Sequence, residues 1–271
     1  MKPGVVLAVV GLAAWITTAA APAAQTAPKP ETPDWVARQI QDRDTGRDSR
    51  AELRMRLFDR QGRVRERAMT LLTRRGTKER DRTLIRFTYP NDIRNTAFLV
   101  WEHPDADDER FLFLPALGRV RRIAGDEKQD SFVGSDLSYE DIGGRELADY
   151  TYAFAAPGAT WTAPDGVTHA AWLLESNAVD PQAKYPRAVS LVLKDRFVVV
   201  HADIFNRRNE REKVFDVSRL ERVDGIWTVL DLAVANERDR TRTELTTNSI
   251  RYNVGLTEDD FSRRALEAPG Q

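Results

Sequence analysis

Three carboxylates lie close together in one short stretch of the sequence, SFVGSDLSYEDI at residues 131–142. If the fold aimed Asp136, Glu140 and Asp141 at one point, they could act as a general acid and base or share a metal ion. No basic or nucleophilic partner lies nearby in the sequence to complete a catalytic set. Catalysis at this stretch would therefore need partners from distant parts of the chain.

A structural role explains more of the residues in this stretch. Gly134 allows the chain to turn, and Ser135 or Asp136 can cap a helical turn whose amide dipoles the acids would complement. The apolar residues and the tyrosine would pin that turn onto apolar surface. We therefore expect a lid or rim rather than a catalytic centre. The predicted lid or rim residues are Phe132, Asp136, Leu137, Tyr139 and Ile142.

Other motifs that would indicate catalysis are missing from the sequence. His103, His169 and His201 lie far apart and show none of the spacings of a histidine metal or acid–base site. There is no nucleophile elbow, P-loop or glycine-rich dinucleotide motif. The acidic run DADDE at residues 105–109 resembles a calcium loop but lacks the glycine and the distal glutamate of an EF-hand, so we interpret it as a solvated hairpin tip. The sequence thus predicts a protein that is not an enzyme and needs no metal or cofactor.

Composition restricts the partners and the sources of stability. The 271 residues carry 41 Lys and Arg against 42 Asp and Glu, a net charge of −1, which provides no field that would draw the protein to nucleic acid. Cysteine is absent, which excludes disulfides, thiol nucleophiles, zinc–thiolate sites and lipidation on cysteine. With 41% apolar residues the chain can bury one substantial core, so we expect one globular domain.

The N-terminal segment has the pattern of a secretory signal peptide. One lysine precedes an apolar run at residues 5–16, and small residues follow that offer A-x-A cleavage sites, at Ala19/Ala21 or Ala21/Ala23. The run is short for a membrane span; an uncleaved anchor is the alternative. We expect a signal peptide at residues 1–24, a flexible lead-in at residues 25–33 and a single domain at residues 34–271. Export from a bacterium would place this domain in the periplasm without a lipid anchor, or outside a Gram-positive cell.

Alternation of apolar and polar residues predicts a sheet-rich fold. Asp34 can cap a short helix that Gly46 ends, and strand patterns then follow one another with no long helix between them. A short closing helix is predicted with Thr257 as its cap and with Phe261 and Leu266 facing inward. So many strands hide their edges by curling or closing. The expected fold class is therefore mainly β (α+β), with an antiparallel sheet that curls on itself.

One long block of sequence carries a family resemblance. Residues 96–142 read TAFLVWEHPDADDERFLFLPALGRVRRIAGDEKQDSFVGSDLSYEDI, and the pieces REKVFDV and TRTELTTNSIRYNVGLTEDDFS follow later. These pieces resemble the LolA-like family of exported outer-membrane lipoprotein-sorting proteins, over most of the chain from about Pro33 onward. The resemblance implies an open antiparallel β-barrel of roughly eleven strands, with short helices as a lid over an apolar cavity that holds acyl chains.

An open, curled sheet of this size has more inward positions than side chains alone fill, so a lined cavity is also expected on physical grounds. We hypothesise a periplasmic carrier that buries acyl chains of a lipoprotein or other lipid for transfer between envelope membranes, each methylene contributing about 0.8 kcal/mol. The alternative is a non-enzymatic accessory subunit that docks on an inner-membrane lipid exporter of the RND or ABC type through the arginines of RVRR (residues 119–122) and RERA (residues 65–68). The predicted cavity-lining residues are Leu53, Met55, Leu57, Met69, Leu71, Ile85, Phe87, Phe98, Val100, Phe111, Phe113, Leu191, Leu193, Val199 and Trp227.

Overall fold

The computed structural model describes residues 31–76, 81–103, 106–143 and 147–268. Thr32–Gln271 form one compact unit. The predicted signal peptide at residues 1–24 and the first part of the lead-in lie outside the described residues, so both stay predictions. None of the helices in the described ranges has the length and apolar character that crossing a membrane requires.

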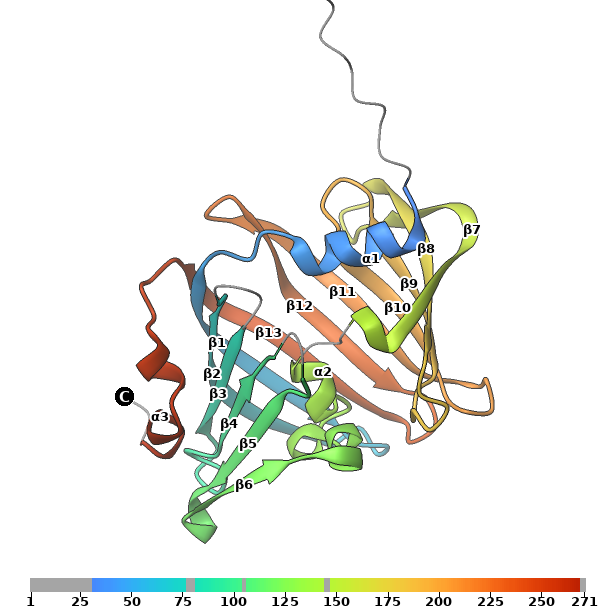
Figure 1. Ribbon diagram of the computed structural model, residues 1–271. Coiled ribbons are helices and arrows are strands. Elements are labelled where there is room, and N and C mark those ends of the chain that lie inside the picture. Colours follow the sequence, from blue (N-terminus) through green and yellow to red (C-terminus); the bar gives the residue numbers. More distant parts are fainter. Residues whose placement is uncertain (1–30, 77–80, 104–105, 144–146, 269–271) are drawn as a thin grey trace, which may run out of the picture. The chain divides into compact units, whose positions relative to one another are not determined.

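Thirteen strands form one antiparallel sheet (Figure 1). Their order is β6–β5–β4–β3–β2–β1–β13–β12–β11–β10–β9–β8–β7, so the sheet has two edges and does not close. This confirms the predicted open, curled antiparallel sheet, with thirteen strands in place of roughly eleven. The strands are β1 (Asp48–Phe58), β2 (Val64–Arg74), β3 (Arg82–Tyr89), β4 (Ala97–Trp101), β5 (Glu109–Leu114), β6 (Arg119–Ile123), β7 (Tyr150–Thr162), β8 (Thr168–Ala178), β9 (Arg187–Leu193), β10 (Val199–Phe205), β11 (Arg211–Val223), β12 (Ile226–Asn236) and β13 (Thr241–Tyr252).

The strand order determines where the chain must cross the sheet. Each strand pairs with its neighbours in sequence, except that β6 and β7 stand at opposite edges and β1 pairs with β13. The chain between β6 and β7 therefore spans the curled sheet. Its first part, residues 124–143, is called the crossover segment here. The segment contains η2 (Gly125–Gln129), η3 (Phe132–Gly134) and α2 (Tyr139–Gly143), and η4 (Leu147–Asp149) then leads into β7. A further single turn, η1 (Pro115–Leu117), joins β5 to β6.

One face of the sheet, called the inner face here, carries a continuous row of cross-strand partners. Residues paired across neighbouring strands lie on the same face of a sheet. This row therefore connects the part of the sheet under α2 to the part under the N-terminal helix α1 (Pro33–Asp42), which crosses in front of β8–β11 in Figure 1. The row consists of Leu57, Thr243, Val234, Phe215, Ala202, Ser190 and Leu174.

The residue that caps helix α1 is Thr32, two residues before the predicted cap Asp34. The hydroxyl of Thr32 accepts a hydrogen bond from the backbone N–H of Trp35 (3.2 Å), and Pro33 occupies the first turn, where its missing N–H costs nothing. The prediction of Asp34 as the cap is therefore wrong, and so is the prediction that Gly46 ends the helix, because α1 ends at Asp42. Its buried residues Val36 and Ala37 pack against β8 and β9.

The opposite, outer face of β3–β5 is covered by the C-terminal segment. Thr257 caps η5 (Glu258–Phe261) in a capping box, and α3 (Arg263–Glu267) follows at once. Phe261 and Leu266 are 1% and 0% exposed, which confirms their predicted inward orientation. Arg86 donates to the backbone carbonyls of Ala265 (2.5 Å) and Leu266 (3.3 Å), and Trp101 donates to that of Phe261 (2.8 Å).

Two predicted cavity residues belong to this outer face. Phe111 pairs with Leu99, and both pack with Phe261, whereas Leu112 pairs with Phe98 on the inner face. Phe113 packs against the same outer cluster. The inward placement of Phe111 and Phe113 is therefore wrong, because a shift of one residue along a strand moves a side chain to the other face.

Candidate functional site

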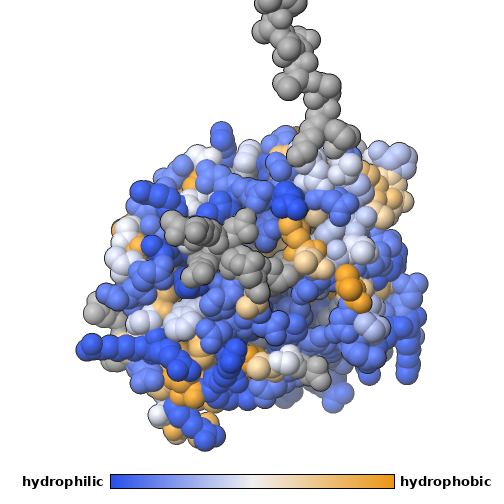
Figure 2. Space-filling model, viewed as in Figure 1, coloured by the Kyte–Doolittle hydropathy of each residue, from blue (hydrophilic) through white to orange (hydrophobic). Residues whose placement is uncertain are grey.

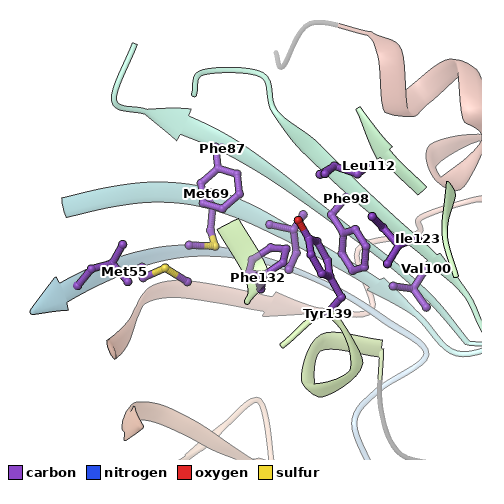
Figure 3. Close-up of a cluster of buried hydrophobic side chains, with 11 residues drawn as sticks. Met55, Met69, Phe87, Phe98, Val100, Leu112, Ile123, Phe132 and Tyr139 are labelled. Atoms are coloured by element: carbon purple, nitrogen blue, oxygen red, sulfur yellow. The ribbon is translucent and has the colours of Figure 1, made fainter. Parts of the chain in front are cut away.

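The crossover segment places two aromatic rings in the main apolar cluster of the inner face. Figure 3 shows Phe132 and Tyr139 among the side chains of β1–β6. The Phe132 ring lies 5.9 Å from that of Phe87 and 5.5 Å from those of Phe98 and Tyr139, measured between centroids. Phe132 is fully buried and Tyr139 is 6% exposed. The crossover segment therefore covers the inner face of β1–β6 with buried aromatic side chains.

Partly buried residues of the same segment complete the covering. Leu137 and Ile142 pack against the cluster, as the sequence predicted for a turn pinned onto apolar surface. The predicted caps Ser135 and Asp136 are wrong, because Ser138 has that role. The Ser138 hydroxyl accepts from the backbone N–H of Asp141 (3.1 Å) and donates to the Asp141 carboxylate (2.9 Å), which also accepts from the Ser138 N–H (2.9 Å).

Hydrogen bonds from the strands hold the middle of the segment. The carboxylate of Asp136 accepts from the hydroxyls of Thr241 (2.5 Å) and Thr243 (2.8 Å) on β13. The ammonium of Lys213 on β11 donates to the Asp136 carbonyl oxygen (2.5 Å). Asp136 is thus engaged with the sheet and does not point freely into solvent as a rim residue would.

A strained residue lies at the centre of this attachment. Val133 has φ 48° and ψ 38°, a left-handed conformation that costs a β-branched residue about 1–3 kcal/mol. The guanidinium of Arg67, only 8% exposed, donates to the Val133 carbonyl oxygen. Burial of Phe132 and this hydrogen bond together hold the strained turn in place.

An apolar cavity remains open between α1 and the inner face. Its volume is about 340 Å³, within the range of small-molecule pockets. Figure 2 shows apolar surface beside α1 on a face that is otherwise mostly hydrophilic. Ser176, Ser190, Gln41, Asp81 and Glu102 supply the polar parts of the wall. The remaining lining residues are Ala37, Ile40, Gly143, Leu147, Tyr150, Tyr152, Leu174 and Val199.

The predicted cavity-lining residues fall into four groups. Val199 lines the apolar cavity. Leu191 and Leu193 alternate with Ser190 of the inner row and lie on the other face of β9, so their predicted inward placement is wrong. Together with Trp227 they belong to or pack against a separate cluster formed by β7–β12. The outer face holds Phe111 and Phe113, as described above. The largest group belongs to or packs against the cluster under the crossover segment, and consists of Leu53, Met55, Leu57, Met69, Leu71, Ile85, Phe87, Phe98 and Val100.

A second, polar pocket of about 570 Å³ lies between the crossover segment and strands β11–β13. Lys213 forms part of its wall, and burial lowers the pKa of this lysine, although Asp141 opposes the shift. Burial also raises the pKa of Tyr185, whose hydroxyl donates to Glu212 (3.1 Å). Leu57 lines the pocket as well and belongs to the apolar cluster, so the pocket adjoins that cluster.

Sequence reasoning missed the residues that hold the crossover segment from below. Lys213 lies two positions before Phe215 on β11, and the register pairs these residues with Asn236 and Val234. A lysine is unusual at an inward position of a strand, so the alternation of apolar and polar residues could have identified Lys213 from the sequence. Thr241, Thr243 and Arg67 gave no comparable signal, because each fits an ordinary strand.

The three histidines and the described residues of the acidic hairpin do not line the apolar cavity or the polar pocket. The histidines make structural contacts instead. His201 contacts Asp216 (2.7 Å), His103 contacts Glu109 (3.3 Å), and His169 stacks on Trp161. Across the described ranges, no group of three His, Cys, Asp or Glu side chains is placed to hold a metal ion. Asp105 of the acidic run lies outside the described residues.

The interpretation of the acidic run as a solvated tip is wrong for one of its members. The side chain of Asp108 is 3% exposed and accepts a hydrogen bond from Arg110 (2.7 Å), whose side chain is 9% exposed. The Asp108 carboxylate also accepts from the backbone N–H of His103 (3.2 Å). Burial raises the pKa of Asp108, and the neighbouring Arg110 opposes that rise.

Comparison with known proteins places this architecture among solved structures. A protein from Desulfovibrio piger of the DUF1329 family is 32% identical and has a TM-score of 0.78, over 86% of this chain and 97% of that one. A domain from Vibrio parahaemolyticus, named as a candidate outer membrane lipoprotein-sorting protein, is 27% identical with a TM-score of 0.78, over 87% and 98%. A LolA superfamily protein from Nitrosomonas europaea shares the fold alone, at 13% identity and a TM-score of 0.65, over 86% and 99%.

Sequence comparison agrees with the structural one. A family model described as "Uncharacterized protein" matches residues 79–268. No curated protein matches the chain significantly. The matched block contains the crossover segment and the two strands that hold it by hydrogen bonds, β11 and β13. From the identity to the Desulfovibrio protein over most of both chains, the chain belongs to the DUF1329 family, and it shares its fold with a LolA superfamily protein.

Proposed function

We propose that the protein is a periplasmic carrier that binds an acyl chain of a lipid or lipoprotein on the inner face of its sheet. The observation that supports this most is the apolar cavity between α1 and the inner face, lined by Ile40, Leu147, Leu174 and Val199. A chain of methylenes needs no fixed polar partner, and each buried methylene contributes about 0.8 kcal/mol. The name of the Vibrio relative, which refers to lipoprotein sorting, agrees with this role.

The crossover segment suggests how the carrier could enlarge its binding site. Phe132 and Tyr139 occupy apolar space in a cluster of the same inner face, and their segment contains the strained Val133. Displacement of the two rings would release that strain and expose Met55, Phe87 and Phe98 to a ligand. We propose that cargo competes with these rings, so that release follows when the segment returns.

Docking on an inner-membrane exporter of the RND or ABC type stays a prediction. Arg119, Arg121 and Arg122 are exposed on the edge strand β6. Arg121 pairs with Glu127 (3.0 Å) and Arg122 with Glu109 (3.9 Å), so a partner that docks there would compete with these exposed ion pairs. Arg67 of the second predicted docking motif is buried and holds the crossover segment, so it is unsuited to this role. We propose exchange of cargo as the function, with no catalytic step.

A probe-binding experiment tests the carrier function. A neutral fluorescent alkyl probe should bind the mature protein, and Ile40→Glu should weaken binding at least tenfold, because a charge buried in the cavity costs several kcal/mol and tenfold requires about 1.4 kcal/mol. Ser190→Leu, which fills the cavity without adding charge, should also weaken binding of the probe. The matched control Arg38→Glu changes an exposed residue of the same helix and should leave binding unchanged.

Circular dichroism must first show that each variant keeps the sheet. Absence of probe binding in the wild type, or equal binding by wild type and both folded cavity variants, would refute the carrier proposal.

A further inference from the structure

The polar pocket has a chemistry that the acyl-binding proposal does not use. It lies beneath residues 131–138 of the crossover segment and is lined on the other side by β11–β13 and the hairpins that flank them. Its cationic lining residues are Arg65, Lys184, Lys213, Arg238 and Arg242, and its acidic ones are Asp59, Asp136, Glu212 and Asp239. The two signs nearly balance in number, so their partners decide what the pocket can bind.

The carboxylates of the pocket are already engaged. Asp59 accepts from Arg63 (2.6 Å), and Asp136 accepts from two threonine hydroxyls. Glu212 accepts from Tyr185 (3.1 Å) and Asn206 (3.1 Å), and Asp239 accepts from Asn236 (3.0 Å). Two of the cations pair with carboxylates, Arg238 with Glu212 (3.6 Å) and Arg242 with Glu244 (2.8 Å). The other hydrogen bonds to Asp136, Glu212 and Asp239 come from neutral donors, which leaves the remaining cations of the pocket without an ion pair.

Three of the cations have no carboxylate partner among the described residues. The Lys213 ammonium donates to a backbone carbonyl and lies 4.7 Å from the centre of the Tyr185 ring. Lys184 lies over the same ring at 5.5 Å, and its side chain makes no ion pair within the described ranges. Arg65, exposed on β2, likewise has no hydrogen bond or ion pair there. The pocket therefore presents three cationic side chains without a carboxylate partner, while its carboxylates are held by hydrogen bonds.

We propose that this pocket binds the anionic oxygen group, phosphate or carboxylate, of an amphiphilic ligand whose chain lies on the inner face. Ammonium and guanidinium groups form charge-assisted hydrogen bonds to such groups. Leu57 and Leu137 line the pocket and also contact or belong to the apolar cluster, so polar and apolar parts of one ligand would meet there. The inference rests on the proposed carrier function, because it places the alkyl chain of the ligand on the inner face. The preference for an anionic head group depends on the pocket alone.

The experiment compares two ligands that carry the same dodecyl chain and differ in their head group. Dodecyl phosphate and 1-dodecanol are titrated against the bound neutral alkyl probe at low ionic strength, where exposed charges are least screened. The wild type should bind dodecyl phosphate at least tenfold more tightly than dodecanol. Arg65→Met/Lys184→Met should lose this preference and keep its affinity for dodecanol, because both side chains are exposed and hold no structural contact beyond the Tyr185 ring.

Matched controls separate the local effect from total charge. Arg54→Met/Arg251→Met removes the same charge from exposed strand positions outside the pocket and should retain the preference. Lys213→Met, if folded, should also lose it. Equal affinity for dodecyl phosphate in the wild type and the pocket variant would overturn the inference, while dodecanol binding would leave the carrier proposal intact.

Two further outcomes distinguish the sources of the anion. Binding of inorganic phosphate with the same dependence on Arg65 and Lys184, but no binding of either alkyl ligand, would identify a free-anion site and overturn both the head-group inference and the carrier proposal. Binding of both alkyl ligands with equal affinity by the wild type would overturn the head-group inference alone.

Discussion

The buried ion pair of Asp108 and Arg110 shows how single residues determine the stability of this fold. Both side chains are almost fully buried, and among the residues that the structure describes the Nε of Arg110 has no hydrogen-bond partner. A Cβ added at Gly143 would lie 3.0 Å from the Arg110 guanidinium, so the end of α2 packs directly on this pair. Loss of one partner would therefore leave a charge in a space that water cannot easily enter.

Asp108→Asn should destabilise the protein by about 3–5 kcal/mol, since it leaves the Arg110 charge buried without its partner. Asp108→Leu/Arg110→Met should recover most of that loss, because it removes both charges and keeps apolar volume. Glu127→Gln, which breaks the exposed pair with Arg121 (3.0 Å), should cost less than about 1 kcal/mol. Chemical denaturation measures all three, and a small effect of Asp108→Asn would contradict this account.

Glu212 makes the stability of the fold depend on pH. Burial alone would raise its pKa, but the hydrogen bonds from Asn206 and Tyr185 outweigh burial and hold the pKa below its ordinary value of 4.5. A carboxylate with a lowered folded pKa contributes stability above pH 4.5, and that contribution disappears as the pH falls through the folded pKa.

Glu212→Gln should therefore reduce the free energy of unfolding at pH 7 by about 1–3 kcal/mol, the size of a hydrogen bond to a charged group. The difference from the wild type should shrink as the pH falls below 4.5. Denaturant titrations at a series of pH values measure this difference. A difference that stays constant down to acid pH would show that the charge of Glu212 has no such role.

At the scale of elements, the crossover segment and the C-terminal segment cover opposite faces of the same strands. Phe132 belongs to the first and Phe261 to the second, and both are essentially buried. Replacement of either ring by a methyl group should cost about 3–5 kcal/mol. The consequences for binding should differ, because only the inner face is proposed to hold a ligand.

Phe132→Ala should increase affinity for the neutral alkyl probe, since it leaves apolar space on the inner face and weakens the covering. Phe261→Ala serves as the matched control, with a similar loss of stability and no gain in affinity. Melting temperatures and probe titrations on the two variants separate these effects. An equal change in affinity for both variants would show that the crossover segment does not compete with ligand.

The sequence was most informative about elements with strong local patterns. Alternation identified the strands, and the spacing of Thr257, Phe261 and Leu266 identified the C-terminal turn correctly. Alternation did not determine which face of β5 points inward, because Phe111, Leu112 and Phe113 are all apolar. Pairing with β4 and the C-terminal segment decides that orientation, and both depend on distant parts of the chain.

The candidate site was harder to predict for the same reason. The segment at residues 131–142 was recognised as a covering turn, but its attachment depends on Thr241, Thr243 and Lys213. These residues come together only because β13 and β11 lie under the crossover segment in the folded sheet. No local pattern around Asp136 predicts partners about a hundred positions away.

At the scale of the whole molecule, the open sheet explains why a covered inner face exists at all. The strand order places β6 and β7 at opposite edges of the sheet, each paired on one side only, so the chain between them must cross the sheet. That crossing brings the rings of the crossover segment and the cations of the polar pocket to one face. A carrier could use such a face because a ligand can enter and leave without breaking the strand ladder.

Native mass spectrometry of the protein purified from its own cell envelope, followed by lipid extraction, tests the carrier function most directly. We expect one or two bound acyl-bearing molecules on the wild type, strongly reduced occupancy on folded Ile40→Glu, and wild-type occupancy on Arg38→Glu. Wild-type protein that leaves the envelope without any bound lipid, or Ile40→Glu protein that carries as much lipid as the wild type, would contradict the account.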